Sequence, residues 1–159
     1  MRKLFIILVL GLFLQTNAFA AKVQRPKLVI GLVVDQMRWD YLYYYYNDYS
    51  SNGLRRLLDG GYSFANTQIS YAPAVTAVGH ASIFTGTVPA IHGIAGNDFW
   101  QNDQAVYCCE DDNVQGVGSD EKGAKMSPHR MLSTTIGDQL RISTDFRSRV
   151  FGVSLKDRA

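Results

Sequence analysis

The segment 27–34 constrains the fold of this chain more than any other. It reads K-L-V-I-G-L-V-V and is followed directly by Asp35. An unbroken run of apolar, largely β-branched residues indicates a strand that is buried on both faces, as in a parallel sheet covered by helices. Asp35 would then lie at the carboxyl end of this strand, which is the edge where ligands bind in open α/β sheets.

The remaining segments alternate between a helical and a strand-like pattern of apolar residues. In chain order we expect a helix at 38–49, a short helix that Ser51 or Asn52 caps and that stops at Gly60, and a helix at 76–85. A hairpin at 99–110, a helix capped by Ser133 at 133–141 and a buried strand at 149–155 follow. Strands that alternate with helices are typical of α/β domains. The sequence therefore predicts the α/β class, with a largely parallel central sheet flanked by helices.

The helix expected at 38–49 has an apolar face. Trp39, Leu42, Tyr43 and Tyr46 recur at the spacing of one helical face. Tyrosines in such a row can stack against a ligand, but stripes of this kind more often seat an amphipathic helix on a sheet. We therefore expect this helix to pack against the sheet.

Residues 1–20 have the pattern of a signal peptide. Arg2 and Lys3 form a positive start, an apolar stretch follows, and Ala18 and Ala20 frame an A-x-A cleavage site. The apolar stretch is short for a membrane span, and no later segment is apolar enough to cross a bilayer. These features predict cleavage near Ala20 and a periplasmic or secreted protein without a stable membrane anchor.

The charge of the mature chain, residues 21–159, argues against nucleic acid as a partner. The sequence has 16 basic and 14 acidic residues, and two of the basic ones, Arg2 and Lys3, lie in the leader. The mature chain is therefore close to neutral and lacks the positive excess typical of nucleic-acid-binding proteins. It ends at Ala159, directly after a strand pattern, so we expect 21–159 to be the N-terminal portion of a larger domain.

Residues 71–97 contain the first candidate for chemistry. Thr76 stands where a short apolar helix begins, and helix N-termini attract phosphate-like anions. A threonine at such a place is commonly a helix cap. To act as a nucleophile it must lose its proton, and a helix terminus contributes only ~0.3–1 kcal/mol to that. A bound Zn²⁺ ion lowers the pKa of a coordinated water by ~9 units, so a nucleophilic Thr76 requires a metal ion.

Four further residues are candidates for a site around Thr76. The carboxylate of Asp35 suits a metal ion or, alternatively, caps a turn. Asn97 follows a Gly-rich loop and has an amide that can donate to an oxyanion. Lys156 and Arg158 are two residues apart at the end of a predicted strand, so both side chains would point the same way and suit a phosphate dianion. Alternatively, Lys156 and Arg158 are a solvated pair of surface residues without a ligand.

The histidines do not form a known zinc motif. Neither H-E-x-x-H nor C-x-x-C occurs in the sequence, and its two cysteines, Cys108 and Cys109, are adjacent. We expect His80 and His92 to be buried, hydrogen-bonded structural residues.

Three blocks of the sequence together resemble the alkaline phosphatase superfamily. They are V-V-D-Q-M-R-W-D-Y-L, T-A-V-G-H-A-S-I-F-T-G-T-V-P-A-I-H-G-I-A-G-N-D and G-V-S-L-K-D-R-A, which begin at Val33, Thr76 and Gly152. More closely, they resemble the PafA-type secreted alkaline phosphatases, in the branch related to type I phosphodiesterases and nucleotide pyrophosphatases. The similarity covers nearly all of residues 21–159.

The resemblance implies a site with two Zn²⁺ ions. Asp35 would be a zinc ligand, Thr76 the metal-bound nucleophile that forms a phosphothreonine, and Asn97 a donor to a phosphoryl oxygen. Lys156 and Arg158 would complete the grip on the phosphoryl group and favour phosphate monoesters, because nucleotide pyrophosphatases of the superfamily lack this pair. The family's remaining zinc ligands would lie beyond this sequence, so we expect residues 1–159 alone to be inactive.

Two other functions stay open on the sequence. One is a phosphodiesterase or nucleotide pyrophosphatase of the same superfamily, which also acts on small-molecule phosphate esters. The other is a non-catalytic secreted binding module, in which Asp35 and Thr76 merely cap turns.

Overall fold

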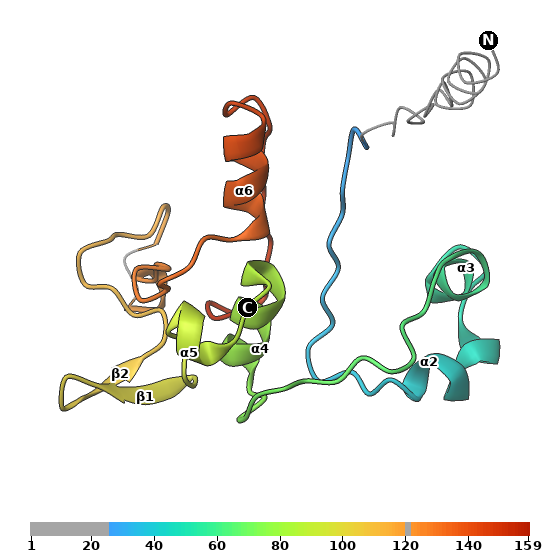
Figure 1. The fold of residues 1–159 in the computed structure, drawn as a ribbon, viewed down its shortest axis with the longest axis horizontal. Coiled ribbons are helices and arrows are strands. Elements are labelled where there is room, and N and C mark those ends of the chain that lie inside the picture. The colour runs from blue at the N-terminus through green and yellow to red at the C-terminus, as the bar shows by residue number, and fades with distance from the viewer. Residues whose placement is uncertain (1–25, 120–121) are drawn as a thin grey trace, which may run out of the picture. The chain divides into compact units, whose positions relative to one another are not determined.

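The computed structural model describes residues 26–119 and 122–159, and the predicted signal peptide lies outside them. The chain divides into two units, Met1–Leu32 and Val33–Ala159. The described residues of the first unit, 26–32, form no helix or strand, and their side chains are exposed. All elements named below belong to the second unit (Figure 1).

The second unit begins with short helical pieces. They are α2 (Tyr41–Tyr44), the 3₁₀ turn η1 (Tyr46–Asp48) and α3 (Leu54–Gly60). The helix predicted at 38–49 is therefore shorter than expected and is interrupted at Tyr45. Its aromatic rings contact one another, with the centroids of Trp39 and Tyr43 4.7 Å apart. Because Trp39 is 56% exposed, the predicted packing of this face against a sheet is not observed.

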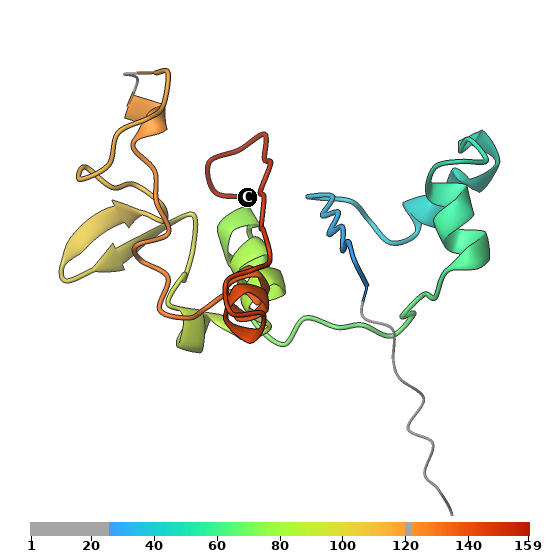
Figure 2. The same cartoon turned by 90° about the horizontal axis from the view of Figure 1, so that it is seen from above.

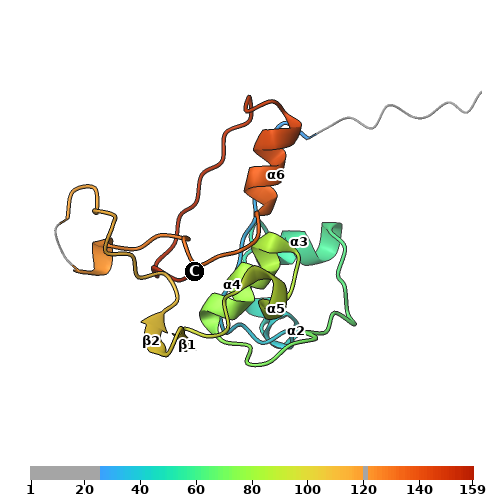
Figure 3. The ribbon, with the colours of Figure 1, turned by 60° about the vertical axis from the view of Figure 1, so that its left-hand side comes forward.

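Helix α4 (Thr76–Thr85) carries the central segment of the sequence, and its predicted bounds are confirmed. It ends at Gly86, whose φ of 67° lies in the left-handed region that glycine adopts without strain. Pro89 starts the one-turn helix α5 (Pro89–His92), where its fixed φ and missing N–H are tolerated. The two helices pack against each other (Figures 1 and 3).

An antiparallel hairpin follows Asn97. Its strands are β1 (Asp98–Gln101) and β2 (Gln104–Tyr107). The turn residues Asn102 and Asp103 have φ values of 52° and 60°, which Asn and Asp adopt more readily than most residues. The predicted hairpin is thus confirmed. Beyond the last strand pair, the Cys108 amide donates to the Asn97 carbonyl oxygen at 2.8 Å and closes the base of the hairpin.

The helix predicted at 133–141 is present, with a different cap. After the 3₁₀ turn η2 (Lys122–Ala124), helix α6 (Ile136–Ser143) packs against α4. Its cap is Thr135 rather than Ser133, because only Thr135 has an acidic residue three positions later. The Thr135 hydroxyl accepts from the Asp138 amide at 3.2 Å, and the Asp138 carboxylate accepts from the Thr135 amide at 2.7 Å.

The core of the second unit is small. Ala77 on α4, Ile94 after α5 and Cys108 after β2 form one buried cluster, and Val78 is fully buried. The C-terminal segment runs back beside α4 (Figure 2).

Cys108 and the neighbouring Cys109 are free thiols. No helix in the described part of the chain is long and apolar enough to cross a membrane.

The predicted parallel sheet is not observed. The sheet in the described residues is the antiparallel hairpin, and residues 27–34 and 149–155 form no strand. A strand requires hydrogen bonds to a neighbouring strand, and a strand buried on both faces also needs cover from both sides. Neither segment pairs with another strand among residues 26–119 and 122–159, so their apolar side chains stay at the surface, with Val153 100% exposed.

His92 is a structural residue, as predicted. Its side chain is fully buried, and its Nδ1 accepts a hydrogen bond from the Ile94 amide at 3.1 Å. The ring proton therefore lies on Nε2, which donates to the Ser82 hydroxyl oxygen at 3.0 Å. Protonation would bury a charge and turn Nδ1 into a second donor opposite the Ile94 amide, and burial accordingly lowers the pKa of His92.

We therefore expect the free energy of unfolding to fall as the pH drops below the ordinary histidine pKa of ~6.5, by at most about 1.4 kcal/mol per pH unit. The sign follows because the unfolded chain binds a proton at His92 that the folded chain excludes. Urea unfolding at about pH 7.5 and about pH 5.5 measures this difference. A His92→Gln variant should lose the part of this pH dependence that His92 contributes. If the free energy of unfolding changed with pH as much in the variant as in the wild type, His92 would not be its source.

Candidate active site

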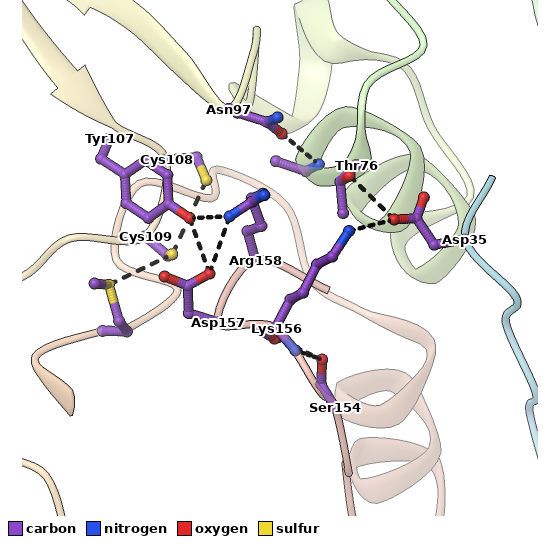
Figure 4. A network of polar contacts seen from close by, with 12 residues as sticks. Asp35, Thr76, Asn97, Tyr107, Cys108, Cys109, Ser154, Lys156, Asp157 and Arg158 are labelled. Atoms are coloured by element: carbon purple, nitrogen blue, oxygen red, sulfur yellow. Dashed lines mark hydrogen bonds and ion pairs between the residues drawn. The ribbon is translucent and has the colours of Figure 1, made fainter. Parts of the chain in front are cut away.

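Thr76 is the first residue of α4, and its side chain points towards Asp35 (Figure 4). The N-cap position belongs to Val75, whose side chain makes no capping hydrogen bond. Instead, the Thr76 hydroxyl donates to Oδ2 of Asp35 at 3.2 Å. Thr76 therefore does not occupy the capping position that the sequence left open for it, and this half-buried residue stands at a helix N-terminus.

Asp35 links Thr76 to the C-terminal segment. The Lys156 ammonium donates to the same carboxylate oxygen, Oδ2, at 2.8 Å. Asp35 therefore binds groups 41 and 121 residues away rather than capping its own turn. The hydrogen bond from Lys156, above all, lowers the pKa of Asp35. A carboxylate with a lowered pKa is a poor proton acceptor for an alcohol, so Asp35 alone does not activate Thr76.

Asn97 lies at the other side of the start of α4. Its Oδ1 accepts a hydrogen bond from the Ala77 amide at 3.0 Å, which fixes the orientation of the side-chain amide. The Nδ2 group, the donor end, makes no hydrogen bond within the described residues. Asn97 is thus held by the helix through its acceptor, while its donor is available to a ligand next to Thr76.

Lys156 and Arg158 both reach this region, although not for the predicted reason. Residues 155–158 form a turn rather than a strand end, so strand alternation does not set their directions. Lys156 binds Asp35, whereas Nη1 of Arg158 donates to the Tyr107 hydroxyl at 2.7 Å (Figure 4). Their side chains are 38% and 29% exposed and each binds another side chain, which argues against a fully solvated surface pair.

Two residues of this network were not predicted, Tyr107 and Asp157. The Tyr107 hydroxyl accepts from Arg158 and donates to Oδ1 of Asp157 at 2.8 Å. Burial is the main cause that raises the pKa of Tyr107 to about 12, so the hydroxyl keeps its proton at neutral pH. Nothing in the sequence marks Tyr107. Asp157 stands between two candidates, but the assumed strand alternation would have turned it away from them.

The histidines satisfy local hydrogen bonds instead of forming a metal site. Nδ1 of His80 donates to the Thr76 carbonyl oxygen, one helical turn back, at 2.8 Å. His129 lies 3.2 Å from the Ser127 hydroxyl and 3.5 Å from the Asp111 carboxylate. The structural role predicted for His92 is confirmed, and half-buried His80 is likewise hydrogen-bonded to the backbone.

Two oxygen donors near α4 suit a metal ion. They are the Asp35 carboxylate and the Thr76 hydroxyl, which are hard ligands of the kind that divalent cations accept. The Lys156 ammonium, 2.8 Å from Asp35, indicates that this position favours positive charge. Among residues 26–119 and 122–159, however, no group of three or more His, Cys, Asp or Glu residues could hold a metal ion. The pair therefore fits as part of a coordination shell that other ligands must complete.

Comparisons with known sequences give a consistent family. The family model described as type I phosphodiesterase / nucleotide pyrophosphatase matches residues 29–148. Alkaline phosphatase PafA of Elizabethkingia meningoseptica is 56% identical over 148 residues, which are 91% of this chain and 26% of the relative. A protein of Myroides odoratus named calcium-transporting ATPase is 56% identical over 139 residues, 86% of this chain and 25% of the relative. The chain thus spans about a quarter of the length of these relatives.

Solved structures agree with the sequence comparison. The crystal structure of wild-type alkaline phosphatase PafA matches with a TM-score of 0.82 and 57% identity, over 86% of this chain and 27% of that one. A PafA variant in which one Thr, one Asn, one Lys and one Arg are replaced matches with the same TM-score. The fold is therefore that of the corresponding part of an α/β alkaline phosphatase. This chain belongs to the type I phosphodiesterase / nucleotide pyrophosphatase family, within the alkaline phosphatase superfamily.

Proposed function

We propose that this chain carries the nucleophile and the phosphoryl-binding residues of a zinc-dependent phosphatase, which hydrolyses small-molecule phosphate monoesters through a phosphothreonine intermediate. One observation carries the proposal. The Thr76 hydroxyl and the Lys156 ammonium share one carboxylate oxygen of Asp35 at the start of α4. A nucleophile, a cation and a metal-ligand candidate therefore meet at a helix N-terminus, where phosphate-like anions are favoured. Relatives named alkaline phosphatases support the phosphatase part of the proposal.

In the proposed reaction, the Thr76 oxygen attacks the phosphorus atom and the bond to the leaving alcohol breaks. Water then removes the phosphoryl group from Thr76 as inorganic phosphate. Bound zinc would supply the lowered pKa that the Thr76 hydroxyl needs, as it does for bound water. Nδ2 of Asn97 would donate to a phosphoryl oxygen, and Lys156 and Arg158 would balance the negative charge of the terminal oxygens.

The solved PafA variant supports this choice of residues. Its four substitutions affect a Thr, an Asn, a Lys and an Arg, with the Thr and Asn separated by the same number of positions as Thr76 and Asn97. The Lys and Arg of that protein are two positions apart, as Lys156 and Arg158 are. Four matching residue types, with the same spacing within each of the two pairs, favour the view that these residues act as one set in this chain.

The proposal extends to a longer protein, because the chain spans about a quarter of its relatives. The exposed apolar segments 28–34 and 150–155 suit interior strands of a parallel sheet that further chain would complete. Two zinc ions and their remaining ligands would belong to this full-length enzyme, so residues 1–159 alone are expected to be inactive. The leader pattern supports a periplasmic or secreted enzyme without a stable membrane anchor, and the near-neutral mature chain argues against nucleic acid as a partner.

Lys156→Ala tests the preference for monoesters. We expect kcat/KM for an aryl phosphate monoester to fall about 10- to 100-fold, the scale of one hydrogen bond to a charged group. The loss for a matched methyl aryl diester should be smaller, because a diester carries one negative charge and lacks the terminal dianion. Steady-state kinetics of the full-length enzyme with both substrates measure the ratio.

Lys125→Ala is the matched control, since the Lys125 ammonium is partly exposed and lies 3.8 Å from Asp112, outside the site. It should leave both rates unchanged. If Lys156→Ala left monoester hydrolysis intact, the role of this cation would be wrong. If the wild-type enzyme preferred the diester, the phosphodiesterase alternative of the same family would replace the proposal. Absence of bound zinc and of any hydrolysis would instead favour a non-catalytic binding module.

A further inference from the structure

We propose that the β1–β2 hairpin positions the phosphoryl-binding residues, and that Tyr107 and Asp157 are positioning residues that hold Arg158 towards the substrate. The inference rests on the proposed function and deepens it. Three side chains, those of Tyr107, Asp157 and Arg158, hydrogen-bond to one another at the base of the hairpin (Figure 4).

The Tyr107 hydroxyl bridges an acid and a base that are adjacent in the chain. It accepts from Nη1 of Arg158 at 2.7 Å and donates to Oδ1 of Asp157 at 2.8 Å, whereas the direct contact between Arg158 and Asp157 is longer, at 3.5 Å. The hydrogen bond to Tyr107 is therefore a shorter restraint on the guanidinium group than the contact with Asp157. In such a chain each hydrogen bond polarises the next, so loss of the hydroxyl loosens Arg158 from both partners.

This arrangement leaves one donor of the guanidinium group, Nη2, for a ligand. Nη1 is occupied by Tyr107, while Nε is buried and makes no hydrogen bond among the described residues. Nη2 likewise has no hydrogen-bond partner within residues 26–119 and 122–159. Because Nε is fully buried, Nη2 is the donor that can reach a phosphoryl oxygen in this arrangement. Tyr107 thus holds Nη1 and leaves Nη2 for the substrate.

The hairpin connects this restraint to Asn97. Asn97 precedes β1, Tyr107 ends β2, and the Cys108 amide donates to the Asn97 carbonyl oxygen at 2.8 Å. Arg130 also fixes the hairpin, because its Nε donates to the Tyr107 carbonyl oxygen at 3.2 Å and its Nη1 to the Gln101 side chain at 2.8 Å. The two legs of one hairpin therefore set the positions of two phosphoryl contacts, Asn97 directly and Arg158 through Tyr107.

Tyr107→Phe removes only the bridging hydroxyl, and we measure its effect in the full-length enzyme. We expect kcat/KM for an aryl phosphate monoester to fall about tenfold. A matched methyl aryl diester, which relies less on Arg158, should lose less than about twofold. In an Arg158→Ala background the same change should cost nothing further, because a positioning residue acts only through the group that it positions.

Tyr49→Phe is the matched control, since the Tyr49 hydroxyl donates to the Tyr41 carbonyl oxygen at 2.7 Å, outside this network. It should leave the ratio of monoester to diester hydrolysis unchanged. An active wild-type enzyme in which Tyr107→Phe keeps this ratio, or adds its full loss to that of Arg158→Ala, would overturn the inference alone. A wild-type enzyme without monoesterase activity would overturn the proposed function before any variant is compared.

Circular dichroism and thermal unfolding establish whether Tyr107→Phe folds. If it does not, Asp157→Asn decides the inference by the same measurements, because this change keeps the size of the side chain and removes its charge. A selective monoester loss that disappears in the Arg158→Ala background supports the inference, and an equal loss in both backgrounds overturns it.

Discussion

Replacing Thr76 with Ala is expected to lower monoester hydrolysis by the full-length enzyme roughly 10⁴- to 10⁶-fold, the scale on which hydrolases respond to loss of their nucleophile. The fold should be preserved, because the Thr76 side chain does not cap α4 and Ala favours a helix. Initial rates measure the loss. Mass spectrometry of acid-quenched enzyme measures the phosphoryl group on the peptide that contains Thr76, which should disappear in the variant.

Two variants separate this chemical role from a structural one. Thr85→Ala removes a hydroxyl from the same helix, where it donates to the Ala81 carbonyl oxygen at 2.6 Å, and should leave the rate nearly unchanged. Thr76→Ser keeps a hydroxyl at the start of α4 and should recover most of the activity. A phosphoenzyme that still forms in Thr76→Ala would show that another group is the nucleophile.

The second large effect is expected for Asp35→Asn, which should lower both zinc content and monoester hydrolysis. Changes in the outer-shell partners of a metal already cost ~10–100-fold in affinity or activity, so loss of a direct ligand should exceed about 100-fold. A neutral amide is a weaker metal ligand than a carboxylate, and it also leaves the Lys156 ammonium without its partner at 2.8 Å. Elemental analysis after dialysis measures the zinc, and rates at increasing zinc concentration measure the affinity.

Asp40→Asn provides the comparison for Asp35→Asn. It makes the same change of carboxylate to amide at an exposed site, where Asp40 pairs with Arg38 at 2.7 Å. Zinc content and rates should both match the wild type. Unchanged zinc content in Asp35→Asn would remove Asp35 from the metal ligands, even if the activity fell through the loss of its contact with Thr76.

Local elements of the fold were predictable, because neighbouring residues determine them. Helix α4 begins and ends where the apolar pattern and Gly86 indicate, and the hairpin turns at Asn102 and Asp103 as their tolerance of positive φ suggests. The cap of α6 is Thr135 rather than Ser133, because only Thr135 has a reciprocal partner, Asp138. It lies three residues after Thr135, and the pattern was therefore readable.

Features that depend on distant parts of the chain were harder to predict. The grouping of Asp35, Thr76 and Lys156 came from a family resemblance, since no local pattern indicates a contact across 121 residues. Tyr107 was missed because a tyrosine at a strand end has no chemical signature of its own. The parallel sheet was inferred from apolar runs, but such runs report what a segment can bury rather than which strand it pairs with.

The register of the hairpin has a consequence for insertions and deletions. Asp98 pairs with Tyr107 next to the site, and Gln101 pairs with Gln104 at the far end. Extra residues at the tip add strand pairs away from the site and leave the spacing between Asn97 and Tyr107 across the base unchanged. One extra residue between Asn97 and Asp98 would shift the pairing by one position, and a shift of one position turns strand side chains to the opposite face. The tip of the hairpin can therefore vary in length, whereas its base cannot.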